Sequence, residues 1–221
     1  MTASDSTQKP VLITGASRGL GAALAETIAS HRHVIAVART TGALEELDDR
    51  IQAAGGSATL APMDVTDTGA MAHLCRSIYD RWGSLHMWCH TAVHAPPLTP
   101  ADHMDGRDFD KTVALNITAT AKLIPMVAPL LQNGGKAVFF DDPQAGRQFF
   151  GAYGSSKAAQ IAMARSWAAE AVSTGADVRI VTPNPMPTAI RARFYPGEDR
   201  AVLADPRVEA QRLLAEIGFG A

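Results

Sequence analysis

The sequence has only two cysteines among its 221 residues, and it has no excess of either sign of charge. Cys75 and Cys89 form neither a metal-ligand spacing nor the cysteine-rich framework of small secreted domains, so we expect free thiols in the reducing cytoplasm. Lys and Arg number 20 against 22 Asp and Glu, which gives a net charge of −2. Without a basic field, neither nucleic acid nor an anionic membrane surface is an expected partner.

A targeting segment and a long apolar run are also missing from the pattern. Residues 1–9 lack the basic and apolar regions of a secretory signal, so we expect a short flexible lead-in there. No apolar run approaches the roughly 20 residues that span a bilayer, so no membrane span is expected. With 47% hydrophobic residues the chain can bury one sizeable core, which predicts a single domain over residues 10–221.

Short apolar runs alternate with longer helical patterns along the chain. Strands are predicted at residues 10–14, 34–38, 58–62, 85–91, 136–140 and 178–182. Helices are predicted at residues 19–30, 43–54, 69–81, 108–132 and 153–174. The alternation predicts right-handed βαβ units and therefore a Rossmann-type α/β fold with a doubly wound parallel sheet. After Arg207 we expect one more helix, and no seventh strand.

The stretch TGASRGLG, residues 14–21, follows the first predicted strand and opens the first predicted helix. Gly15 permits a tight turn, Gly19 lets the backbone approach a pyrophosphate, and Gly21 permits close packing of helix on strand. The helix start offers free N–H groups and a positive dipole end to phosphates. Strand, glycine-rich turn and helix in this order predict a dinucleotide-binding site.

The second predicted strand ends at Arg39, where an NAD site carries an acidic residue that binds the ribose 2′-hydroxyl. Together with Arg18 in the glycine-rich turn, Arg39 can clamp a 2′-phosphate through charge-assisted hydrogen bonds. This favours NADP(H), with an ordinary exposed arginine at a strand end as the alternative. Asp64, after the third predicted strand, can accept a hydrogen bond from adenine or simply cap a turn.

Tyr153 and Lys157 are four residues apart at the start of an alanine-rich helical pattern, so their side chains share one face. A neighbouring ammonium group stabilises a phenolate and lowers the pKa of a tyrosine from about 10 toward neutrality. General acid–base catalysis needs such a pKa. Taken alone, the same spacing is also that of an ordinary surface pair.

With both motifs at this separation, the chain resembles the short-chain dehydrogenase/reductase family from Val11 to about Thr188. The resemblance implies reversible hydride transfer between NADPH and a small-molecule carbonyl or alcohol, with Tyr153 as the acid–base group and Lys157 as its partner. It also implies that Asn116 kinks the central helix and holds a water of the proton relay. The motifs and the resemblance together imply cofactor contacts at Gly15, Ser17, Arg18, Gly19, Leu20, Gly21, Arg39, Thr40, Asp64, Val65, Ala92, Lys157 and Thr188.

Three positions depart from the family pattern. Val93 stands where the family has a glycine close to the cofactor, and Asn184 replaces a glycine near the nicotinamide. The third departure is Asp142, or its neighbour Asp141, at the position of a serine whose hydroxyl donates to the substrate oxygen.

A carboxylate at the serine position changes the chemistry that we expect. Ionised Asp142 can only accept hydrogen bonds, repels a developing oxyanion and raises the pKa of Tyr153. A neutral carboxylic acid surrounded by Phe139, Phe140 and Phe149 is the alternative, because it can still donate. The sequence therefore predicts an NADP(H)-dependent oxidoreductase or, alternatively, a cofactor-binding protein with little turnover that acts by associating with a partner.

Three further features bear on partners. His86, His90 and His94 are spaced by four, but a strand that runs into a loop does not bring such positions together, so no metal site is expected. The apolar run 123–131 and the alanine-rich run 158–171 suit helix packing, and the resemblance implies a homodimer. Residues 188–206 are predicted to form a lid over the substrate.

Overall fold

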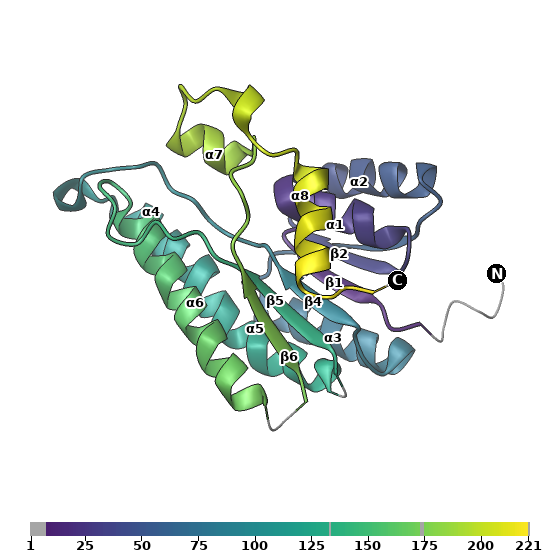
Figure 1. The fold of residues 1–221 in the computed structure, drawn as a ribbon. Coiled ribbons are helices and arrows are strands. Elements are labelled where there is room, and N and C mark those ends of the chain that lie inside the picture. The colour runs from purple at the N-terminus through teal and green to yellow at the C-terminus, as the bar shows by residue number, and fades with distance from the viewer. Residues whose placement is uncertain (1–7, 133, 173–174, 221) are drawn as a thin grey trace.

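The computed structural model describes residues 8–132, 134–172 and 175–220, and shows one sheet with helices on both faces (Figure 1). The strands are β1 (Val11–Thr14), β2 (Val34–Ala38), β3 (Ala58–Pro62), β4 (Met87–His90), β5 (Lys136–Phe140) and β6 (Asp177–Val181). All neighbours pair in parallel, in the order β3-β2-β1-β4-β5-β6. The chain crosses over between β3 and β4, which places a crevice at the carboxyl ends of β1 and β4. The predicted doubly wound α/β fold is confirmed.

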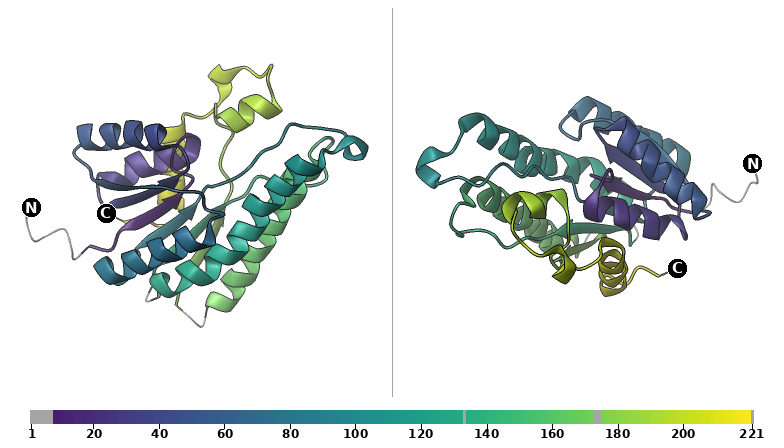
Figure 2. Two further views of the ribbon diagram at one scale, coloured as in Figure 1. Left: turned by 180° about the vertical axis from the view of Figure 1, so that it is seen from behind. Right: turned by 90° about the horizontal axis from the view of Figure 1, so that it is seen from above.

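Two sets of helices cover the sheet (Figure 2). Helices α1 (Gly19–Ala29), α2 (Thr41–Ala53) and α8 (Pro206–Glu216) supply the core on one face. Helices α3 (Thr68–Trp82), α5 (Thr120–Val127) and α6 (Gly151–Ala171) supply the core on the other. Every residue of β1, β2 and β4 is buried, because helices shield both sides of these strands.

The long central helix, predicted at residues 108–132, is continuous but irregular. It consists of α4 (Gly106–Thr112), a π-helical segment (Val113–Ala119), α5 and a 3₁₀ turn (Ala128–Leu131). Asn116 lies in the π-helical segment, so the predicted irregularity at this residue is confirmed. By length and composition alone, the helix Gly106–Leu131 is long and apolar enough to cross a membrane. This corrects the prediction that no apolar run is long enough. Core helices of soluble proteins meet the same criterion.

The last part of the chain follows β6 without another strand among the described residues, as predicted. Helix α7 (Ala189–Phe194) and a 3₁₀ turn (Arg200–Val202) lie within the predicted lid segment and project above the sheet (Figure 1). Helix α8 then packs against α1. Two parts of the predictions, the lead-in at residues 1–7 and the helix end at 173–174, lie outside the described residues.

Candidate cofactor and active site

A cleft of about 1100 Å³ lies at the carboxyl ends of the strands. Its lining combines the glycine-rich turn, the ends of β2 to β5, the start of α6 and the segment after β6. The predicted site residues that line it are Gly15, Ser17, Arg18, Gly19, Leu20, Gly21, Arg39, Asp64, Val65, Ala92, Asp142, Tyr153, Lys157 and Thr188. Thr40, at the N-cap of α2, and the fully buried Asn116 lie outside this lining.

The glycine-rich turn has the geometry that a phosphate-binding turn requires. Gly15 has a φ of 91°, and a Cβ there would lie 2.5 Å from the backbone nitrogen of Ala92. A Cβ on Gly21 would lie 2.3 Å from the carbonyl oxygen of Gly15. Among the described residues, the side chain of the N-cap residue Arg18 makes no capping bond to α1. The first residues of α1, Gly19 to Gly21, line the cleft and their N–H groups have no side-chain cap, so this turn fits the phosphates of a dinucleotide.

Two guanidinium groups stand at the adenosine end of the cleft. Arg39 Nη1 lies 3.7 Å from Asp64 Oδ2, with the Arg39 side chain 67% exposed. The Arg18 carbonyl oxygen accepts from the Ala22 N–H at 3.4 Å, whereas the Arg18 side chain has no hydrogen-bond or ion-pair partner within the described part of the chain. Asp64 Oδ1 caps its own turn, because it accepts from the backbone N–H and the hydroxyl of Thr66 at 2.9 and 2.8 Å. Both arginines are thus available to bind an anionic group such as a 2′-phosphate.

The opposite end of the cleft holds the Tyr153 hydroxyl, which donates a hydrogen bond to Asp142 Oδ2 at 3.0 Å. Asp142, and not Asp141, therefore occupies the serine position; Asp141 lies 3.8 Å from Arg165. Burial raises the pKa of Tyr153 above its ordinary value, and the charge and hydrogen bond of Asp142 raise it further. The predicted lowering of the tyrosine pKa by Lys157 is wrong for this arrangement, because burial and Asp142 dominate.

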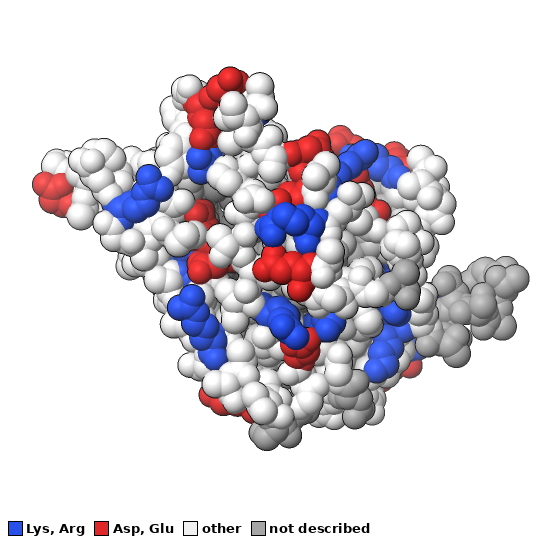
Figure 3. All heavy atoms as spheres, in the orientation of Figure 1, with Lys and Arg blue, Asp and Glu red and all other residues white. Residues whose placement is uncertain are grey.

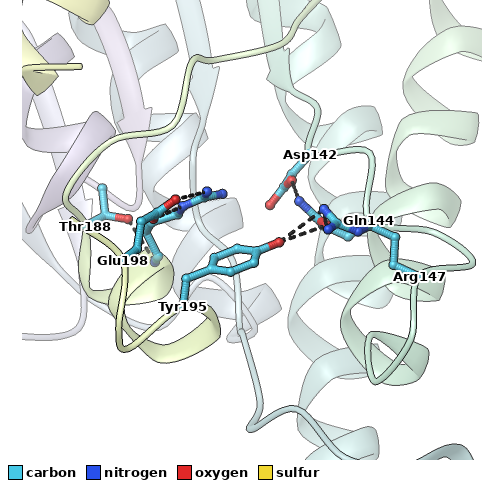
Figure 4. A network of polar contacts seen from close by, with 7 residues as sticks. Asp142, Gln144, Arg147, Thr188, Tyr195 and Glu198 are labelled. Carbon is cyan, nitrogen blue, oxygen red and sulfur yellow. Dashed lines mark hydrogen bonds and ion pairs between the residues drawn. The ribbon is translucent and has the colours of Figure 1, made fainter. Parts of the chain in front are cut away.

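Asp142 is also part of a polar network that reaches the lid (Figure 4). Its Oδ1 accepts from Gln144 Nε2 at 2.6 Å, and Gln144 Oε1 accepts from Arg147 at 2.8 Å. Since a guanidinium can only donate, the Gln144 oxygen must face Arg147 and its amide nitrogen must face Asp142. Both carboxyl oxygens of Asp142 thus lie within hydrogen-bond distance of a protein donor.

The lid meets this network through an aromatic cluster. Arg147 also donates to the hydroxyl of Tyr195 at 3.1 Å. Phe194 packs on the Tyr153 ring with centroids 4.8 Å apart, and on Phe150 at 5.0 Å. Phe194 of α7 therefore covers the Tyr153 ring, and Tyr153 is only 4% exposed.

The lid itself is held by Arg191. Its guanidinium is paired with Glu198, with Nε to Oε2 at 2.6 Å, and lies 3.9 Å from the centre of the Tyr195 ring. Thr188 caps α7 by accepting from the backbone N–H of Arg191 at 3.2 Å (Figure 4). These contacts stabilise residues 188–198, and the hydrogen bond from Arg147 to Tyr195 joins them to the loop between β5 and α6.

Lys157 is buried and donates to Gln160 Oε1 at 2.7 Å. Burial lowers the pKa of Lys157 from 10.5 to about 8, although the charges of Asp142 and Asp141 act in the opposite direction. Gln160 Nε2 in turn donates to Thr120 Oγ1 at 2.9 Å. Gln160 was missed from the sequence, and its one signal is a polar side chain within an alanine-rich run.

The Thr120 hydroxyl connects this chain of contacts to His90. The two ring nitrogens of His90 lie 3.0 Å from Thr120 Oγ1 and 2.8 Å from Thr14 Oγ1. His90 is 1% exposed, and burial, with the charge of Lys157, lowers its pKa to about 3. His90 is therefore a neutral core histidine, and in the part of the chain that the structure describes no cluster of His, Cys, Asp and Glu could hold a metal.

Asn116 serves a structural role. Its Oδ1 accepts from the backbone N–H of His94 at 2.7 Å. Its Nδ2 donates to the His94 carbonyl and to Ser156 Oγ, both at 2.9 Å. Both hydrogens of the Asn116 amide are therefore engaged within the protein, and Asn116 ties the loop after β4 to α6.

The two other departures also lie at the cleft. Val93 lines it and packs against the cluster around Phe150. Asn184 donates from its backbone N–H and from Nδ2 to the two oxygens of Glu209 on α8. Sequence reasoning missed Glu209, because nothing in the pattern links an acidic residue of the last helix to a loop 25 residues earlier.

The loop between β5 and α6 packs directly against the first turn of α6. A Cβ on Gly154 would stand 2.7 Å from the carbonyl oxygen of Gln144. The glycine next to Tyr153 thus lets the loop approach closely enough for Asp142 to reach the tyrosine hydroxyl.

Comparisons with known proteins agree on one family. The family model described as short chain dehydrogenase matches residues 9–199. A sorbitol dehydrogenase of Cereibacter sphaeroides is 28% identical in an alignment 222 positions long, which covers 96% of this chain and 84% of the relative. A fatty acyl-CoA reductase of Mycobacterium tuberculosis is 32% identical over 168 residues, which cover 73% of this chain but only 57% of the relative. A short chain dehydrogenase of Shigella flexneri, solved with NADP, has a TM-score of 0.83 and 26% identity, and the match covers 92% of this chain and 88% of that one.

Proposed function

The chain belongs to the short-chain dehydrogenase family, and we propose that it is an NADP(H)-dependent oxidoreductase that transfers hydride between NADPH and a carbonyl or alcohol substrate. One observation carries the proposal. A single cleft brings the Tyr153–Lys157 pair of α6 together with the glycine-rich turn, the unpaired guanidinium group of Arg18 and the exposed guanidinium group of Arg39. The solved relative with NADP supports this choice of cofactor.

The residues present fit the cofactor. The glycine-rich turn and the start of α1 would hold the pyrophosphate, Arg18 and Arg39 the 2′-phosphate, and Lys157 the ribose hydroxyls. When bound, the nicotinamide would supply or accept the hydride at the substrate carbon.

Tyr153 would move the proton. In carbonyl reduction its hydroxyl donates to the substrate oxygen, which requires the proton to turn away from Asp142 Oδ2. The Asp142 carboxylate opposes the negative charge that develops on that oxygen, because it cannot donate to it. We therefore infer slower turnover than a serine at this position would allow. Lys157, with its pKa near 8, carries a proton at neutral pH and partly offsets this charge.

The substrate class follows from the surroundings of Tyr153. Phe150, Phe194 and Tyr195 form an aromatic wall, with Ile190 and Leu98 packed against it. We infer that the substrate is a ketone or aldehyde with an apolar body, because Phe194, Tyr195 and Ile190 of this cluster line the cleft. The fatty acyl-CoA reductase among the relatives is consistent with this class.

We also propose a homodimer. In the apolar window of the helix Gly106–Leu131, only 33% of the residues are buried within one chain. A second copy packed on α5 and α6 would cover the rest. Light scattering should report twice the chain mass; a monomer at high concentration would overturn the dimer.

The function is tested by titrating the pure protein with NADPH by fluorescence and then adding a panel of ketones and aldehydes. We expect binding, and NADPH oxidation with at least one apolar carbonyl. Tyr153→Phe should bind NADPH with unchanged affinity and lose about 10³-fold in turnover, as expected for an acid–base group.

A second candidate function is favoured by the hydrogen bond between Tyr153 and Asp142. It is a cofactor-binding protein with little turnover, which acts by NADP(H)-dependent association with a partner. NADPH binding without oxidation across the panel, in the wild type and in Asp142→Ser, would support this candidate. Absence of binding would overturn both functions.

A further inference from the structure

We propose that Glu209 of helix α8 is a positioning residue, which holds the loop between β6 and α7 against the cofactor cleft. The inference rests on the proposed function, since it assigns this loop to the cofactor site. It concerns an interaction outside the Tyr153–Lys157 pair and the glycine-rich turn.

Glu209 is 2% exposed, yet all of its bonding capacity is used. Its Oε1 accepts from the backbone N–H of Asn184 at 2.8 Å and its Oε2 from Asn184 Nδ2 at 2.9 Å. Arg212 donates to the same two oxygens, at 2.6 and 3.0 Å. A buried carboxylate is costly unless it is paired and hydrogen-bonded, and this one has both kinds of partner.

Arg212 extends the contact to the start of the loop. Its Nη2 lies within hydrogen-bond distance of the Thr182 carbonyl oxygen, at 3.3 Å, and its Nη1 donates to Glu216 at 2.8 Å. Over α8, the space-filling view shows basic and acidic side chains side by side (Figure 3). Glu209 and Arg212 together therefore hold the backbone of Thr182 and both the backbone and the side chain of Asn184.

The loop forms the wall of the cleft that faces the glycine-rich turn. Thr182, Asn184 and Thr188 all line the cleft. A Cβ on Gly19 would lie 3.3 Å from Cγ2 of Thr188, so the two walls nearly touch. A displacement of the loop by about 1 Å would change the width of the site, and such misplacements impair catalysis strongly.

Helix α8 braces the other wall as well. Arg207 Nη2 lies 2.8 Å from Glu26 Oε2 on α1, the helix that begins at the glycine-rich turn. One helix thus contacts both sides of the cleft through charged groups, Arg207 toward α1 and Glu209 toward the loop. This gives the last helix a role in the binding site as well as in the core.

The pairing explains why an asparagine stands at position 184. A glycine there would keep the backbone N–H bond to Glu209, but it would leave Oε2 without its second donor. Burial raises the pKa of Glu209, but the hydrogen bonds from Arg212 and Asn184 outweigh it and bring the pKa below its ordinary value. Glu209 is therefore ionised and acceptor-only at neutral pH, which matches two donors from Asn184.

Glu209→Gln tests the proposal, with Glu216→Gln as the matched control on the same helix. The glutamine amide presents hydrogens toward Asn184 or Arg212, which can only donate there. We expect the amides of residues 182–188 to exchange about tenfold faster in the cofactor-free Glu209→Gln protein, and its Kd for NADPH to rise about tenfold. Glu216 contacts Arg212 but not the loop, so Glu216→Gln should match the wild type in both measurements.

Unchanged exchange in residues 182–188 together with an unchanged Kd in Glu209→Gln would overturn the proposal. A lower melting temperature with both quantities unchanged would show a purely structural role, which also overturns it. If Glu209→Gln fails to fold, Asn184→Gly removes a single bond from the partly exposed loop and should raise both quantities severalfold. If the wild type binds no NADPH, the proposed function fails, while the exchange of the loop amides still decides the role of Glu209.

Discussion

The two ends of the cleft differ in how their functional groups are occupied. At the end formed by β1, β2 and β3, Arg18 and Arg39 are exposed, and the first turn of α1 has open N–H groups. At the end formed by β4, β5 and β6, Tyr153 is bonded to Asp142 and Lys157 to Gln160. The first end is prepared for a ligand, whereas the second already satisfies its polar groups with the protein itself.

This difference shows where the departures from the family pattern have their effect. Two of the three departures have an internal hydrogen-bond partner: Asp142 bonds Tyr153, and Asn184 bonds Glu209. A substrate must therefore compete with existing hydrogen bonds, while a dinucleotide phosphate need not. We expect cofactor binding to be robust and turnover to be the step that these internal bonds limit.

The largest effect is expected from removing the internal partner of the catalytic tyrosine. Asp142→Ser should raise carbonyl reduction about 10²-fold, because a hydroxyl donor replaces a negative charge beside the substrate oxygen. The pKa of Tyr153 should fall, since Asp142 contributes to its elevation. Reduction needs the protonated phenol, so the alkaline decline of the kcat/KM profile should move to lower pH.

Asp141→Ser is the matched control for that variant, because Asp141 is adjacent but pairs with Arg165. It should leave turnover within a few-fold of the wild type. If Asp142→Ser instead lowers the rate of carbonyl reduction, Asp142 acts as a neutral donor. The hydrogen bond between Tyr153 and Asp142 would then not be what limits turnover.

A smaller effect is expected at the open end of the cleft. Arg39→Ala should weaken NADPH binding about tenfold and leave NADH binding nearly unchanged, because a charge-assisted bond to the 2′-phosphate is lost. Paired fluorescence titrations with both cofactors measure this. Equal losses for NADPH and NADH would show that Arg39 does not read the 2′-phosphate.

The smallest effect is expected at His90, and it concerns stability. His90→Asn should lower the free energy of unfolding at pH 7 by about 1–2 kcal/mol, since Thr14 and Thr120 lose a partner. The folded-state pKa of about 3 lies below the unfolded value of 6.5. Between these values only the unfolded chain binds the proton, so His90 makes wild-type stability fall as pH decreases from 6.5 toward 3.

Urea unfolding at several pH values checks this prediction. The difference between His90→Asn and the wild type should shrink below pH 6.5. A constant difference from pH 7 to pH 4 would contradict the assignment of His90 as a buried neutral group.

The fold could be predicted from the sequence because its signals are local. Apolar runs and helical periodicity placed all six strands to within two residues, and the first glycines, the Tyr153–Lys157 spacing and Asn116 marked the site. The choice between Asp141 and Asp142 could not be made, since it depends on the shape of the loop before α6. In that loop Phe149 has a φ of 70°, a conformation that an aromatic residue seldom adopts and that no pattern announces.

The partners of the functional groups could not be predicted for a different reason. Gln160 acts through Thr120, 40 residues earlier, and Glu209 acts on Asn184, 25 residues earlier. Tyr195 reaches Arg147 from the lid, which the sequence located only as a segment. Such contacts depend on tertiary packing and carry no periodicity, so they are visible only once the elements are assembled.

The close approach at Gly154 has a consequence for engineering this site. Because the loop carbonyl of Gln144 occupies the space that a side chain would need, the loop from residue 141 and the first turn of α6 form one transferable block. We expect Gly154→Ala to push the loop off the helix and so move Asp142 away from Tyr153. This would free the Tyr153 hydroxyl without changing either residue.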